Sequence, residues 1–143
     1  MKIGEIKAEA LMLMGVNSNT NISWTDIEGY KDEPSYSSYI YAMVGAINRC
    51  LSRFYIVGAI DVKPLPIDAN TEEYAEITAF AEGVDDVLAN MIPLYVVGDV
   101  FALDEPSVAQ NKRSEFEGML EEYMGKRAYT TQDKVDIIYG DDV

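Results

Sequence analysis

Apolar side chains recur every three or four residues along four stretches of the chain, which is the spacing of one face of a helix. These stretches are residues 2–14, 35–55, 85–101 and 104–125. The second carries two neighbouring apolar rows, which make a face wider than one surface contact needs, so we expect it at the centre of the core or packed on a second subunit as well. The pattern predicts a mainly α protein, a helical bundle of about four to five helices.

Residues that favour helix starts stand before three of the predicted helical segments. Ser23 has Asp26 three positions further on, which predicts a short capped turn. Asp85 precedes an apolar stretch and is the expected N-cap of its helix. Asp104 or Glu105 is expected to cap the last helix in the same way.

The last two helices contain residues that should shape them. Pro93 lies inside its helix, where it removes one backbone donor and clashes with the preceding turn, so we predict a kink. Asp104, Glu105 and Pro106 are expected to form a hinge between the two helices, since proline is tolerated in a first turn. Gly125 is expected to end the last helix.

The rest of the chain lacks helical spacing. Residues 16–35 are rich in turn formers, and prolines limit residues 62–65 to an edge strand or an extended connector. Residues 134–139 are β-prone and predict a short terminal strand, which pairs with residues 62–65 in a small β-hairpin-like arrangement or with another chain. We therefore expect a helical domain over residues 1–128 and a C-terminal tail over residues 129–143.

The chain is acidic, and its charge is uneven. Its net charge is −14, with six basic and eight acidic side chains in residues 1–71 and five basic and seventeen acidic ones in residues 72–143. Such a chain should repel DNA phosphates. The acidity fits a solvated, soluble surface, and it also fits an acidic face that meets a basic partner or lines a passage.

Composition removes several classes of chemistry. The chain has no histidine and one cysteine, Cys50, which excludes Ser–His and Cys–His pairs and almost excludes a zinc site. Adjacent carboxylates diverge along a helix instead of facing each other, and no glycine-rich phosphate loop occurs. No apolar run is long enough for a membrane span, and the charged first residues do not form a signal peptide. We expect no enzyme, no cofactor and no bound metal.

Aromatic and basic residues supply the candidate interface. Tyr41 lies outside both apolar rows of its helix, and tyrosine is enriched in protein interfaces. The net charge argues against the basic residues as a DNA-binding surface. Lys126 and Arg127 fit either cations at a helix C-terminus or an interface ion pair. The candidate interface residues are Tyr41, Arg49, Arg53, Lys126, Arg127, Val135, Ile137, Ile138 and Tyr139.

Two stretches carry a family resemblance. In residues 92–120 an apolar helix with a proline and a tyrosine leads into an acidic-proline turn, and a helix with an arginine and a Phe-Glu pair follows. Residues 47–53 contain Asn-Arg and Ser-Arg steps. The residues concerned are Pro93, Tyr95, Asp99, Asp104, Glu105, Pro106, Arg113, Phe116, Glu117 and Leu120, with Asn48, Arg49, Ser52 and Arg53 before them. Over about half its length the chain resembles phage and prophage head–tail connector (adaptor, head-completion) proteins.

The resemblance implies a structural virion assembly protein. Its subunits would form an oligomeric ring at the head–tail joint, contacting the portal protein and the tail or tail-completion protein, after synthesis in the cytoplasm of the bacterial host. DNA would pass through the ring without specific binding, and no membrane is involved. Two alternatives stay open. One is an acidic protein-binding regulator or DNA mimic, and the other is an enzyme that uses carboxylates and a divalent metal.

Overall fold

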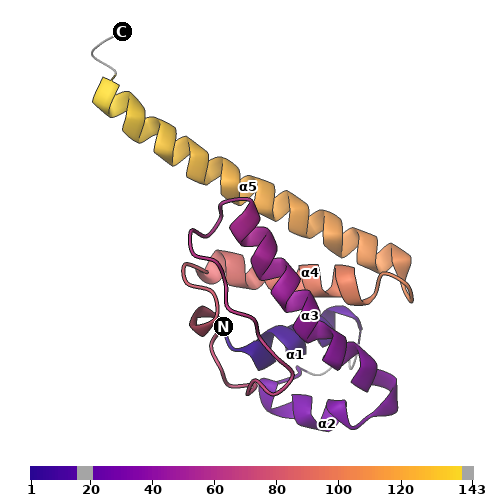
Figure 1. Ribbon diagram of the computed structural model, residues 1–143. Coiled ribbons are helices and arrows are strands. Elements are labelled where there is room, and N and C mark those ends of the chain that lie inside the picture. The colour runs from indigo at the N-terminus through magenta and orange to yellow at the C-terminus, as the bar shows by residue number, and fades with distance from the viewer. Residues whose placement is uncertain (16–20, 140–143) are drawn as a thin grey trace.

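The fold is mainly helical in the part of the chain that the structure describes. The computed structural model describes residues 1–15 and 21–139, and the side chains of residues 1–15 and 21–126. No strand occurs in these residues, so the mainly α prediction is confirmed (Figure 1). The elements are, in order, α1 (Ile3–Leu13), η1 (Trp24–Asp26), α2 (Ile27–Lys31), α3 (Pro34–Ile56), η2 (Ile77–Ala79), α4 (Asp86–Val100) and α5 (Pro106–Tyr139), where η marks a short 3₁₀ helix.

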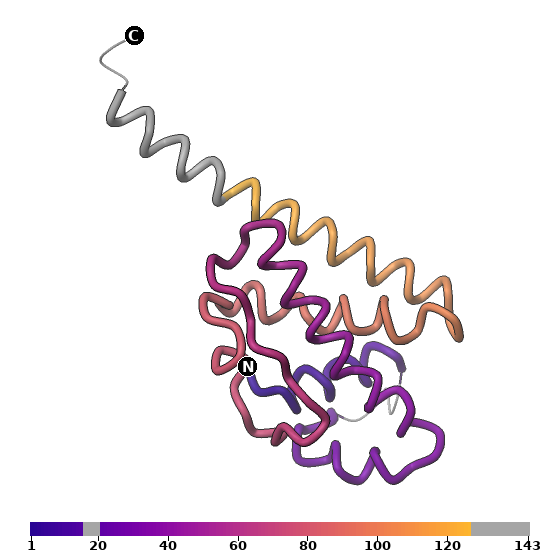
Figure 2. Tube along the Cα trace, in the orientation of Figure 1, coloured from indigo at the N-terminus to yellow at the C-terminus, as the bar shows by residue number. Residues whose placement is uncertain are grey.

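The core lies around α4, against which α1, α3 and α5 pack. α4 and α5 run antiparallel, and α3 passes across α4 (Figures 1 and 2). The rings of Phe54 and Phe116 stack with centroids 6.0 Å apart, and the Tyr95 ring meets Phe116 edge-on at 5.1 Å. Both apolar rows of α3 contribute buried side chains, which confirms its predicted central place. These are Ile40, Met43, Val44, Ala46, Ile47, Cys50, Leu51 and Phe54.

The start of α1 is held by a segment some seventy residues later in the chain. The Ile3 amide donates to the Ala75 carbonyl, and the Gly4 amide donates to the Glu73 carbonyl, each at 2.8 Å. A Cβ atom on Gly4 would lie 2.7 Å from the Trp24 Cβ, so only glycine fits this approach.

The segment that contains residues 62–65 is an extended connector, one of the two forms expected from its prolines. The Asn48 side chain of α3 accepts a hydrogen bond from the Ile67 amide at 2.9 Å and donates one to the Ile67 carbonyl at 2.8 Å. The Leu65 amide donates to the Phe80 carbonyl at 2.7 Å. Side chains and single backbone bonds therefore hold this segment, where a sheet would use a ladder.

The predicted strand over residues 134–139 and the predicted helix end at Gly125 are both wrong. α5 continues from Pro106 to Tyr139. A lone strand needs a partner strand to satisfy its backbone, whereas a helix satisfies its own. Gly125 is tolerated inside α5 because glycine costs a helix only about 1 kcal/mol relative to alanine. α5 crosses the division between residues 128 and 129, which stays a prediction.

Two predicted helix starts are confirmed. Ser23 and Asp26 form a reciprocal capping box, in which the Ser23 amide donates to Asp26 Oδ2 at 2.9 Å. The Asp85 carboxylate accepts from the Leu88 amide at 2.9 Å and caps α4. It also accepts from the Tyr123 hydroxyl at 2.9 Å, so one side chain joins the start of α4 to α5.

The turn predicted as a hinge joins α4 to α5. Pro106 is the first residue of α5, and the Glu105 carbonyl accepts from the Ala109 amide at 3.0 Å. Pro93 lies buried inside α4, and the kink at this position stays a prediction.

Candidate functional site

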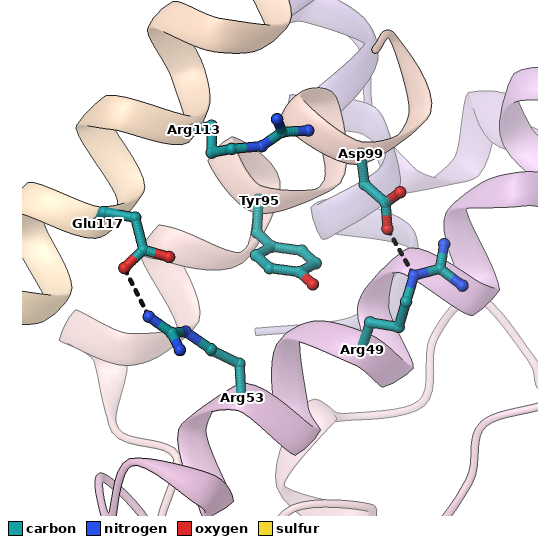
Figure 3. A pocket seen from close by; sticks show the side chains of 6 residues that line it. All are labelled: Arg49, Arg53, Tyr95, Asp99, Arg113 and Glu117. Atoms are coloured by element: carbon teal, nitrogen blue, oxygen red, sulfur yellow. Dashed lines mark hydrogen bonds and ion pairs between the residues drawn. The ribbon is translucent and has the colours of Figure 1, made fainter. Parts of the chain in front are cut away.

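A charged cleft of about 410 Å³ opens between α3, α4 and α5. Each helix contributes two side chains that are four positions apart, so both lie on the face that looks into the cleft (Figure 3). The lining residues are Arg49 and Arg53 of α3, Tyr95 and Asp99 of α4, and Arg113 and Glu117 of α5. The cleft thus holds three guanidinium groups and two carboxylates, and its excess charge is positive although the chain is strongly acidic.

Two ion pairs cross the cleft from α3. The Arg49 Nε atom lies 2.6 Å from Asp99 Oδ2, and the Arg53 Nη2 atom lies 2.7 Å from Glu117 Oε2. All four side chains are partly exposed, so each pair stabilises the fold by no more than about 1 kcal/mol. Gly45 leaves room for one of them, since a Cβ there would lie 3.2 Å from Arg49 Nη1.

The third guanidinium group has a different environment. Arg113 Nη2 donates to the Gly98 carbonyl at 2.6 Å, and no carboxylate among the described residues lies within ion-pair distance of Arg113. Gly98 also lets the two helices approach, because a Cβ there would lie 3.3 Å from the Ala109 carbonyl oxygen. Arg113 is therefore fixed by the backbone of α4 and keeps an uncompensated positive charge.

Two groups at or near the cleft have raised pKa values. The Tyr95 ring lines the cleft and meets the Phe116 ring edge-on, and burial together with the nearby Asp99 carboxylate raises the pKa of Tyr95. Cys50 is a fully buried thiol whose pKa is raised well above its usual value by burial, with a further contribution from Glu117. Neither group is set up as a nucleophile at neutral pH, because both stay protonated there.

The predicted interface residues fall into three groups. Arg49 and Arg53 come together in the cleft. Tyr41 lies elsewhere on α3 with 57% of its surface exposed, and Lys126 pairs with Glu122 on α5 at 3.2 Å. The side chains of five others lie outside the described residues, namely Arg127, Val135, Ile137, Ile138 and Tyr139.

Four lining residues were absent from the candidate interface, although the resemblance includes all of them. They are Tyr95, Asp99, Arg113 and Glu117. A signal for them exists in the sequence, because each of the three helices carries a polar or charged pair at i and i+4. The pairing between helices is not visible in such spacing, since it depends on how the helices cross.

A second charge cluster is buried beside α1. Lys7 Nζ lies 3.0 Å and Lys31 Nζ 2.6 Å from the same Glu73 oxygen, Oε1. Burial lowers the pKa of Lys7, and the Glu73 carboxylate opposes that shift. Because both lysines contact Glu73 inside the fold, this cluster joins the segment before η2 to α1 and α2, and it offers little surface to a ligand.

Three further findings concern metal sites, membrane spans and similar proteins. No group of three metal-ligating side chains occurs there. Nor does any helix among these residues combine the length and apolarity that crossing a membrane requires. Comparison with protein-family models, with curated proteins and with solved structures gave no match.

Proposed function

We propose that this chain is a structural subunit of a phage or prophage head–tail connector. It forms a ring at the joint between the portal and the tail, through which DNA passes. Its work is packing and assembly, with no catalytic step.

The convergence of the two resembling stretches is the observation that carries this proposal. Residues 47–53 and 92–120 are separated in sequence, and the resemblance alone gives no reason for them to touch. In the fold, Arg49 pairs with Asp99 and Arg53 pairs with Glu117, across the cleft. The residues that carry the resemblance thus form one structural unit, as the shared core of a family would.

Charge supports the same role. The chain carries −14 overall, and the basic side chains of the cleft are partly paired with carboxylates. A ring built from such subunits offers DNA no strong phosphate-binding surface, so DNA passes without being held.

Mixing the purified chain with a portal protein from the same phage or prophage tests the proposal. We expect ring-shaped density on the portal in electron micrographs and a matching mass by light scattering, and portal alone is the control. A chain that stays monomeric both alone and with its portal contradicts the proposal. A monomer or dimer that binds an unrelated basic protein favours an acidic regulator instead.

A further inference from the structure

We propose that the cleft around Arg113 receives an exposed carboxylate from a second copy of the chain, which makes it the contact between neighbouring subunits. This inference rests on the proposed function, because it names the partner of the cleft within the ring. The ligand group is an aspartate or glutamate side chain.

The first argument is the unbalanced charge of the cleft. Arg49 and Arg53 each have an internal carboxylate partner, whereas Arg113 has only the Gly98 carbonyl. A guanidinium group carries five N–H donors in a fork that matches the two oxygens of a carboxylate. Arg113 therefore has N–H donors left for one more anion.

The second argument is that neighbouring residues hold the arginine side chains of the cleft in place. Gly98 allows the close approach of α4 and α5 that brings Arg113 to its carbonyl anchor, and Gly45 clears space for the Arg49 guanidinium group. The Tyr95 ring lines the cleft and is held by its edge-on contact with Phe116. Because Arg113 is already held by its hydrogen bond to the Gly98 carbonyl, its side chain loses less entropy when it binds a carboxylate.

The third argument selects a second copy as the source of the carboxylate. Subunits of charge −14 repel one another, so their association needs a local site of opposite sign. Among the described residues the cleft brings together three guanidinium groups, which makes it a local site of this kind. Each copy also carries an excess of carboxylates, so every subunit brings both halves of a head-to-tail contact, which is the kind of contact that closes a ring.

Charge reversal at two adjacent positions of α5 tests the proposal. Arg113→Glu places a negative charge in the cleft, and Lys112→Glu makes the same change of charge at a residue that pairs with Glu115 and does not line the cleft. We expect Arg113→Glu to weaken subunit association on the portal about 30-fold or more, as loss of one partner of a buried interfacial charge pair does. Lys112→Glu should change it less than about threefold.

Salt dependence and folding provide two further readouts. Assembly of the natural chain and of Lys112→Glu should weaken as salt rises, and Arg113→Lys, which keeps the charge without the fork, should fall between the natural chain and Arg113→Glu. Circular dichroism must show the same helix content in all variants. If Arg113→Glu is misfolded, Arg113→Gln replaces it, because it removes the charge and keeps an amide donor.

The outcomes separate the two proposals. If Arg113→Glu forms rings as well as the natural chain does, the proposed cleft contact is wrong, and the proposed head–tail connector function is unaffected. A natural chain that never associates with itself or with the portal overturns both. Loss of assembly in Arg113→Glu alone, with Lys112→Glu intact, supports both.

Discussion

The Tyr39 hydroxyl donates a hydrogen bond of 2.5 Å to Asp104 Oδ2, and this bond ties α3 to the turn between α4 and α5. The Tyr39 ring also meets Phe101 edge-on, with centroids 5.2 Å apart. The hydrogen bond to Asp104, with a smaller contribution from burial, raises the pKa of Tyr39. The turn predicted to be a hinge is thus fastened to the body of the protein.

Because of this hydrogen bond, the free energy of unfolding should fall as the pH becomes alkaline. Because the pKa of Tyr39 is higher in the folded state, its contribution is complete below about pH 10, the usual tyrosine value, and is lost as pH rises through that region. Tyr39→Phe should lower the free energy of unfolding by about 1 kcal/mol at pH 8 and make its decline above pH 9 shallower. Urea unfolding at pH 8 and at a series of pH values above 9 measures the loss of stability and its pH dependence. The control is Tyr41→Phe on the same helix, and equal pH slopes for Tyr39→Phe and the natural chain would contradict the prediction.

Two glycines inside helices should respond to substitution in opposite directions. A side chain at Gly98 meets the Ala109 carbonyl oxygen and the Arg113 Cβ at 3.3 Å, whereas a Cβ at Gly118 meets nothing within 4 Å. Gly98→Val should therefore cost about 2 kcal/mol of unfolding free energy through overpacking. Gly118→Ala should add about 0.5–1 kcal/mol, because alanine restricts the unfolded chain. Urea titration of both variants measures the difference, and stabilisation by Gly98→Val would refute the close approach of α4 and α5.

Removal of the Glu73 carboxylate should be among the most damaging single changes. Glu73 and Lys7 are both more than nine-tenths buried, and Glu73→Ala leaves the Lys7 ammonium group in the interior without its partner. Breaking a buried pair in this way costs about 3–5 kcal/mol. Glu72→Ala removes a neighbouring exposed carboxylate and is the matched control. Thermal unfolding of the two variants should differ by many degrees, and equal melting temperatures would argue against the buried cluster.

Cys50 should be chemically silent in the folded protein. Its thiol is fully buried, and burial raises its pKa well above the usual value, so little thiolate forms at pH 8. We expect no modification by iodoacetamide under native conditions and complete modification in urea, as measured by mass spectrometry. Rapid native modification would show that α3 separates from the core on the time scale of the reaction.

Local features were predictable where one stretch of sequence decides them. The two apolar rows of α3 predicted a helix with a wide buried face, and the Ser23–Asp26 spacing predicted a capped turn, because both depend on residues a few positions apart. The strand over residues 134–139 was predicted from β-prone residues, and it was wrong because a helix that starts at Pro106 continues through them.

The charged contacts were not predictable in the same way. Arg49 and Asp99 are fifty positions apart, and Lys7 and Glu73 are sixty-six apart. Each of these side chains looks like an ordinary solvated charge in the sequence. Their pairing follows from the crossing of helices, which the packing of the whole core decides. The resemblance brought the cleft residues together as a motif without indicating that they share a space.

Asn48 has a consequence for how the protein avoids aggregation. Its amide makes the two hydrogen bonds to Ile67 that a residue of a neighbouring strand would make. The Asn48 side chain thus satisfies the N–H and C=O groups of Ile67 as a neighbouring strand would. The extended segment beside α3 therefore does not expose these two backbone groups to other chains. A leucine at this position would uncover these groups, and an aspartate would place its negative charge against the Ile67 carbonyl. This single amide therefore lowers the tendency of the segment to pair with a strand edge of another chain.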